Sequence, residues 1–479
     1  MKGIDEKDIK DARLMLFRQV IILPLRFVRS LIILPLLPQS AIFLLKIIST
    51  WFGYVPRLML GTNAILGFYY PVAKKENDYD KQDRYFSLSW RFALFASLTG
   101  GVVGIIISYS YLSLAYIPFL LVWGLSVAPL AHINSALFAK GNFNRIARID
   151  ILAAVANFIL PLVGWFLFEF LGYIGGSAIS LALTIFIGRK EIFIRTISLN
   201  RSFVKKNVKK GIHFWLNGFL QDLAKSFEIT LFAIIPSVIS KEYGGQYAVA
   251  MTLTGIVNQL IVSLSMVLQR KVTMQLGEGN KRGYKHLLDY MAIDIIVFVV
   301  LYIIFIPVSD ILVFFLPNYS LLSEILPILL MGMFFLRLRY YPGLDFKIKK
   351  RFWEIHWGHI IHLFIVISIV FVFYYKIELP RYLIAISQLS GALIGTLLVL
   401  KLFLDNNKGI YSRSIITAFI ARMCMLLSII VVHFMIENSV VKYITEIIIA
   451  FIIIVSILIK FPRTYDIIKQ LIGSKISKL

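Results

Sequence analysis

The chain has 479 residues, of which 59% are hydrophobic, and its mean hydropathy is +0.81. A water-soluble domain cannot bury this much apolar surface, so the composition excludes a soluble protein and indicates a polytopic membrane protein. No segment resembles a cleavable signal peptide, and we read the polar start, Met1–Arg13, as a short cytoplasmic tail. Cys424 is the one cysteine, which excludes an intrachain disulfide.

The formal net charge of +24 would suggest a nucleic-acid partner in a soluble protein, but its distribution indicates membrane topology instead. Basic residues concentrate in alternate connections between apolar runs, and the intervening connections hold few. This bias predicts a multi-pass protein of the cell (plasma or inner) membrane, with both termini in the cytoplasm and anionic lipid headgroups as neighbours. The apolar runs predict about fourteen spans, over residues 14–37, 41–70, 87–110, 113–139, 147–170, 172–194, 209–239, 245–270, 286–316, 320–342, 352–376, 379–403, 413–436 and 440–461.

The first two spans carry positive charges that a lipid bilayer disfavours. Arg18, Arg26 and Arg29 lie in the first span, and Arg18 and Arg29 are about 20° apart around a helix. Lys46 and Arg57 lie in the second span with the same spacing of eleven residues. Each such charge costs about 2.5–3.5 kcal/mol at a helix centre, so these side chains should face a protein interior or a wet cavity. Snorkelling to the headgroups is the alternative, and it suits Arg18 and Lys46, near predicted helix ends, better than the others.

Four consecutive segments resemble one family of transporters. They are an arginine-bearing first span (RQVIILPLRFVRSLIILPLL), a second span ending in LMLGTNAILGFYYP, a short polar loop (AKKENDYDKQDR) and an aromatic third span (SLSWRFALF). Together with the fourteen-span plan, they resemble the oligosaccharide and polysaccharide flippases, including those of O-antigen-type lipid-linked oligosaccharides. These belong to the multidrug/oligosaccharidyl-lipid/polysaccharide exporter (MOP) superfamily.

The resemblance implies an all-α fold of two six-helix lobes around a central cavity, followed by two extra C-terminal helices. We predict an N-terminal lobe over 1–200, a C-terminal lobe over 201–405, and two further spans with an amphipathic cytoplasmic tail over 406–479.

The resemblance also implies a substrate and its contacts. The family transports a sugar chain on a polyprenyl pyrophosphate, whose head enters a basic cavity. Guanidinium groups bind phosphate oxygens through paired hydrogen bonds and stay charged. Carrying the family's site over, we expect Arg26, Arg29 and Arg57 to contact the substrate, with Arg18 and Arg270 near the cytoplasmic mouth. No covalent step is needed, so we predict a transporter and not an enzyme.

The seventh span carries a polar face. Asp222, Lys225 and Glu228 lie there among apolar residues. One interpretation is an internal ion pair of Lys225 with Glu228 or Asp222. The other is a site for a coupling cation, H⁺ or Na⁺, because acids inside a membrane often mark such sites.

Three histidines, His356, His359 and His362, recur every third residue and share about 120° of one predicted helix. Zinc binding, proton coupling and simple packing are all open readings, and the absence of nearby cysteines disfavours zinc. We therefore predict no metal site and no cofactor. A cluster of glycines at Gly100, Gly101 and Gly104 lies inside a span and indicates close helix packing instead of a nucleotide loop.

The sequence thus predicts a flippase that moves a lipid-linked oligosaccharide from the cytoplasmic to the outer leaflet by alternating access, for cell-surface glycan assembly. A drug or metabolite exporter of the same superfamily is the main alternative. A membrane glycosyltransferase or polymerase is a further alternative, but it would need a metal or nucleotide site at one membrane face.

The predicted topology can be tested by cysteine accessibility. In a Cys424→Ser background, we expect Ser202→Cys to be shielded from an impermeant reagent added outside intact cells, because the loop over 195–210 should be cytoplasmic. Labelling should appear once the cells are opened. Labelling in intact cells would contradict the topology.

Overall fold

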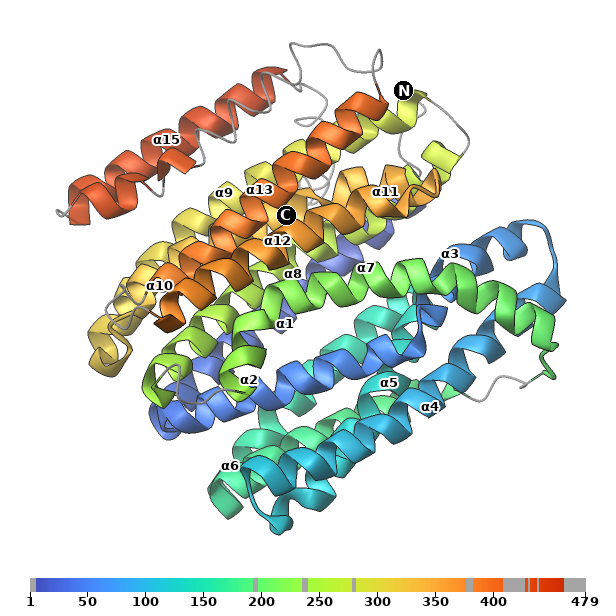
Figure 1. The fold of residues 1–479 in the computed structure, drawn as a ribbon, viewed down its shortest axis with the longest axis horizontal. Helices are drawn as coiled ribbons and strands as arrows, with labels where there is room; N and C mark the ends of the chain where they lie inside the picture. Colours follow the sequence, from blue (N-terminus) through green and yellow to red (C-terminus); the bar gives the residue numbers. More distant parts are fainter. Residues whose placement is uncertain are drawn as a thin grey trace, which may run out of the picture. The chain divides into compact units, whose positions relative to one another are not determined.

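The structure is a computed structural model, and it describes residues 6–192, 197–234, 240–277, 281–375, 382–407, 427–429, 431–436 and 439–460. In these ranges the chain forms long α-helices with short 3-10 helices between them, which confirms the predicted all-helical class (Figure 1). Nine helical segments of the described ranges are long and apolar enough to cross a membrane. Most of the predicted span 413–436 and the whole predicted amphipathic tail, 464–479, lie outside the described residues.

The helices form two compact units. The first unit is Phe17–Ala248, and the second unit is Val249–Leu479 together with Met1–Leu16. The helices of the first unit are α1 (Glu6–Leu36, from Phe17 on), α2 (Gln39–Tyr54), η1 (Val55–Met59), α3 (Thr62–Lys75), α4 (Tyr79–Tyr111), η2 (Leu114–Tyr116), α5 (Ile117–Lys140), α6 (Phe143–Gly188), η3 (Arg189–Glu191) and α7 (Arg201–Ile234). Those of the second unit are α8 (Lys241–Gly277, from Val249 on), α9 (Lys281–Phe315), η5 (Pro317–Tyr319), α10 (Leu322–Leu338), α11 (Tyr340–Ile348), α12 (Phe352–Tyr375), α13 (Leu383–Asn406) and α15 (Ser439–Lys460).

The predicted second span, 41–70, is not one helix. It is divided into α2, η1 and α3. Pro56 lies in the first turn of η1, and Leu60 and Gly61 after it adopt left-handed backbone conformations at φ 49° and 75°. An α-helix cannot continue through such residues. The interruption places Arg57 in η1, where its side chain leaves the chain at a turn instead of along a helix face.

Helix α6 is a helical hairpin. Phe168 and Glu169 have non-helical dihedrals in its middle. Gly164 and Gly172 pack so closely, each against the other's carbonyl, that neither site has room for a Cβ. In a straight helix these residues would be about 12 Å apart, so the chain reverses direction between them. The two arms correspond to the two spans that the sequence predicted over 147–170 and 172–194.

Glycines join α4 to α5, which lie side by side in Figure 1. A Cβ at Gly100 would collide with the Gly124 carbonyl, and one at Gly104 would collide with the Leu120 carbonyl. The predicted packing role of the glycine cluster is therefore confirmed, because only residues without a side chain let the two backbones approach this closely.

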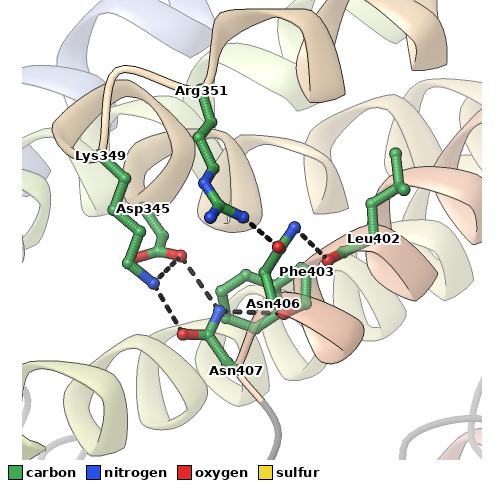
Figure 2. A network of polar contacts seen from close by, with 7 residues as sticks. All are labelled: Asp345, Lys349, Arg351, Leu402, Phe403, Asn406 and Asn407. Carbon is green, nitrogen blue, oxygen red and sulfur yellow. Dashed lines mark hydrogen bonds and ion pairs between the residues drawn. The ribbon is translucent and has the colours of Figure 1, made fainter.

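Two buried carboxylates join connections that the sequence places on the same side of the membrane. In the second unit, Asp345 on α11 accepts hydrogen bonds from Lys349 (2.9 Å) and Asn407 (3.1 Å), which follow α11 and α13 (Figure 2). In the first unit, Glu191 pairs with Lys140 and with Arg145 (2.7 Å), which lie at the end of α5 and the start of α6. The basic connections in each unit thus meet around one acid.

The glycine contact predicts a difference between two chemically identical substitutions. Gly100→Ala should destabilise the protein by about 1–3 kcal/mol, because the new methyl group collides with a fixed carbonyl. Gly53→Ala in α2 is the control, since nothing lies within 4 Å of the added Cβ; it should be neutral or stabilise by up to about 1 kcal/mol. Thermal unfolding of the two purified variants measures both, and equal melting temperatures would contradict the prediction.

Candidate functional site

The described part of α1 carries three arginines, and α6 supplies partners for them. Arg18 is 8% exposed, and its Nη1 lies 2.9 Å from Oδ2 of Asp150. Arg26 lies within electrostatic range of Asp150, Arg18 and Arg29. One carboxylate thus interacts electrostatically with two guanidinium groups of α1.

Arg29 has a neutral partner. Its Nη1 donates a hydrogen bond of 2.9 Å to the backbone carbonyl of Asn157 on α6. The Asn157 side chain is itself held, because its Oδ1 accepts a hydrogen bond from Ser180 in the second arm of the hairpin at 2.7 Å. A carbonyl dipole orients a guanidinium group but does not neutralise its charge, so Arg29 keeps the capacity to attract an anion.

Arg57 pairs with Asp222, a residue 165 positions away on α7. Its Nε donates to Oδ2 at 2.6 Å, and its Nη2 lies 2.6 Å from the same oxygen. The two side chains are 32% and 28% exposed, so the pair is reachable from outside the protein. One turn earlier on α7, Gly218 leaves room for the guanidinium group, since a Cβ there would collide with Nη1.

Tyr54 holds α7 one turn beyond Asp222. Its hydroxyl lies 2.8 Å from Ser226 Oγ and 3.1 Å from Thr230 Oγ1. Ser226 has non-helical dihedrals, so α7 kinks at this point. Gly211, Gly218, Asp222, Ser226 and Thr230 form one stripe along α7 that faces α2, η1 and α3.

One of the polar residues predicted in the seventh span has a partner on another element. Asp222 forms an ion pair with Arg57, which the sequence did not predict. Glu228 is fully buried, and Lys225 lies half-buried between them. The side chain of Arg270 lies outside the described side chains.

The three histidines of α12 are packed in the second unit. All are at most 3% exposed. His362 Nε2 lies 3.0 Å from Gln388 Oε1 on α13, and His359 Nδ1 lies 3.4 Å from Arg339 Nη1. Among the described residues no cluster of metal-binding side chains is found. His362 thus packs against α13, and His359 packs against Arg339.

Two arginines near the end of the predicted span 320–342 are largely enclosed by the second unit. Arg339, only 2% exposed, donates hydrogen bonds to the carbonyls of Gly358, Gly391 and Ala392 and to Thr396 Oγ1. Arg337 lies 3.4 Å from Asp294, which also accepts a hydrogen bond from Tyr341. The sequence signal was weak, because charge at the end of an apolar run is usually topological.

Comparison with known proteins identifies the class of fold. No protein-family model and no curated protein matches the sequence. Solved structures do match: the outward-facing conformation of a multidrug resistance MATE family transporter of the MOP superfamily superposes with a TM-score of 0.66 at 15% identity, over 85% of this chain and 97% of that one. Its inward-facing conformation gives a TM-score of 0.62 at 14% identity, over 85% and 97%.

Another structural neighbour is a MOP superfamily transporter from Pyrococcus furiosus. The reverse polarity of its binding pocket suggests a different function for that transporter. It superposes with a TM-score of 0.65 at 15% identity, over 85% of this chain and 98% of that one. The chain therefore has the fold of the MATE transporters of the MOP superfamily. These neighbours are transporters and not enzymes, so the fold gives no support to a glycosyltransferase or polymerase.

The Arg18–Asp150 pair predicts a measurable loss of stability. Asp150→Asn should destabilise the protein by about 1–3 kcal/mol, because it leaves a buried guanidinium group without its counter-charge. Asp80→Asn is the control: Asp80 pairs with Arg84 at 2.8 Å, but both side chains are well exposed. The control should change stability by at most about 0.5 kcal/mol. Chemical or thermal unfolding that ranks the two variants equally would contradict a structural role for Asp150.

Proposed function

We propose that the protein is a flippase that moves a polyprenyl-pyrophosphate-linked oligosaccharide from the cytoplasmic to the outer leaflet. The observation that carries the proposal is the concentration of guanidinium groups on α1, where Arg29 bonds to a neutral carbonyl that leaves its charge in place. Positive charge within a membrane span is costly unless an anion compensates it. A pyrophosphate carries the charge and the oxygen geometry that arginines bind best.

The arginines divide into two groups under this proposal. Arg26, Arg29 and Arg57 contact the pyrophosphate. Arg18, which is nearly buried and held by Asp150, orients this part of α1 near the cytoplasmic mouth, with Arg270 as a second residue there. The polyprenyl tail stays in the bilayer, because moving its CH₂ groups through water would cost about 0.8 kcal/mol each.

Topology and energy source form the remaining part of the proposal. Both termini lie in the cytoplasm, and rocking of the two lobes carries the head across. A coupling cation, H⁺ or Na⁺, would use Asp222, Lys225 and Glu228. Of these three residues, Glu228 is the one that is fully buried.

An exporter of soluble molecules is the second candidate, supported by the multidrug resistance transporters among the structural neighbours. The arginines of α1 disfavour cationic drugs by charge repulsion, so this candidate would export an anionic metabolite. A pocket of reverse polarity in the Pyrococcus furiosus neighbour supports the idea that charge within this fold selects the cargo.

A flipping assay on reconstituted single variants tests the proposal. Arg26→Ala, Arg29→Ala and Arg57→Ala should each slow flipping about tenfold or more, since each removes charge-assisted hydrogen bonds to phosphate. The lysine variants should be intermediate, because ammonium keeps the charge but loses the two-pronged contact.

Arg84→Ala is the matched control, as Arg84 lies in an exposed pair on α4. Its rate should equal that of the wild type. Wild-type flipping by all three alanine variants at equal amounts of folded protein would remove the main physical support for the flippase. Transport of a soluble anion without the lipid would favour the exporter.

A further inference from the structure

The guanidinium group of Arg57 has two edges that can form a pair of parallel hydrogen bonds. One edge carries Nε and Nη2, and the other carries Nη1 and Nη2. Asp222 occupies the first edge, because its Oδ2 lies 2.6 Å from both Nε and Nη2. A single carboxylate oxygen, Oδ2, thus contacts both nitrogens of an edge that could bind two oxygens.

The guanidinium group of Arg57 packs against α7 at Gly218. A Cβ at that position would collide with Nη1 and lie 2.9 Å from Cζ, so only a glycine fits beneath the group. A phosphate group that makes a two-pronged contact with Nε and Nη2 must displace the carboxylate of Asp222 from that edge.

The carboxylate is not what attaches α7 to its neighbours. Gly211 packs against the backbone of Leu60 and Gly61, and Tyr54 bonds to Ser226 and Thr230 beyond the kink. Phe68 and Phe214 add a stacked ring contact, with centroids 5.1 Å apart. These contacts flank Asp222 on both sides, so α7 stays in place when the ion pair opens.

We propose that Asp222 is an internal competitor anion that occupies the phosphate-binding edge of Arg57 and thereby sets the affinity threshold for phosphate-bearing substrates. This inference rests on the proposed function of Arg57 as a pyrophosphate contact. An anion with one charge gains little by replacing a carboxylate that is already tethered nearby. A pyrophosphate carries more charge and is attracted more strongly, so it displaces Asp222 at lower concentrations than weaker anions do.

Competition of this kind raises the apparent dissociation constant of every anion by the same factor. The apparent dissociation constant equals the intrinsic one divided by the fraction of protein whose Arg57 edge is open. A partly exposed ion pair such as this one is weak, so it lowers the fraction of open protein only modestly. Removal of the carboxylate should therefore tighten anion binding about two- to fivefold. The factor should be the same for inorganic pyrophosphate and for orthophosphate, although their absolute affinities differ.

Calorimetric titration of the purified full-length protein with inorganic pyrophosphate and with orthophosphate tests the inference. Asp222→Asn should bind both anions about two- to fivefold more tightly than the wild type. Asp222→Glu should stay near the wild type, because the competing charge remains. Arg57→Ala combined with Asp222→Asn should abolish the gain, because the edge itself is gone.

Asp80→Asn is the matched control, since it removes the same charge from an exposed ion pair on α4. A gain in that control equal to the gain in Asp222→Asn would mean that net charge alone is responsible, and it would overturn the inference. Unchanged or weaker binding by Asp222→Asn, or no binding at all, would also overturn it. The two hypotheses can fail separately. If Arg57→Ala weakens anion binding but Asp222→Asn does not tighten it, Arg57 remains a phosphate contact and Asp222 is not its competitor.

Discussion

Compensation of guanidinium charge is the constraint on which the first unit depends. An arginine removed from water without a partner costs several kcal/mol, and a membrane span offers few partners. Asp150 on α6 forms an ion pair with Arg18, and Asp222 on α7 forms one with Arg57. Each acid lies on a helix far along the chain from its arginine, so charge pairing selects which helices pack together, while apolar contacts alone would allow many arrangements.

Close backbone contacts give that pairing its geometry. Gly61 and Gly211 bring the turn after η1 against α7, and Gly218 leaves space for the Arg57 side chain to lie flat over the helix. Larger residues at these sites would separate the two elements and lengthen a 2.6 Å contact whose strength falls steeply with distance. The small residues and the charged pair therefore act together. The glycines set how closely η1 approaches α7, and the charges determine that Arg57 pairs with Asp222.

Hydropathy was enough to predict the helices, because backbone groups within a membrane must be satisfied inside the segment. The same signal concealed the break at Pro56 and Gly61, since the apolar run continues across it, although both residues are known helix breakers. The partner of Arg57 could not be predicted, because no local pattern links residues 165 positions apart. The burial of Arg339 was equally hidden, since its partners are mainly backbone carbonyls, which leave no trace in a sequence.

A comparison of Arg339 with Arg57 indicates which kind of arginine is built for structure and which for binding. Arg339 is 2% exposed, and each of its three nitrogens donates to an oxygen of the second unit, so no donor is offered to a ligand. Arg57 is about a third exposed and rests on one oxygen of one carboxylate. Burial keeps anions away from Arg339 and its carbonyl partners, whereas the carboxylate beside the partly exposed Arg57 is a counter-ion that another anion can replace. The difference in burial and partners, more than the shared presence of arginine in apolar helices, therefore separates the two residues, and it is why we assign the proposed binding role to Arg57 and not to Arg339.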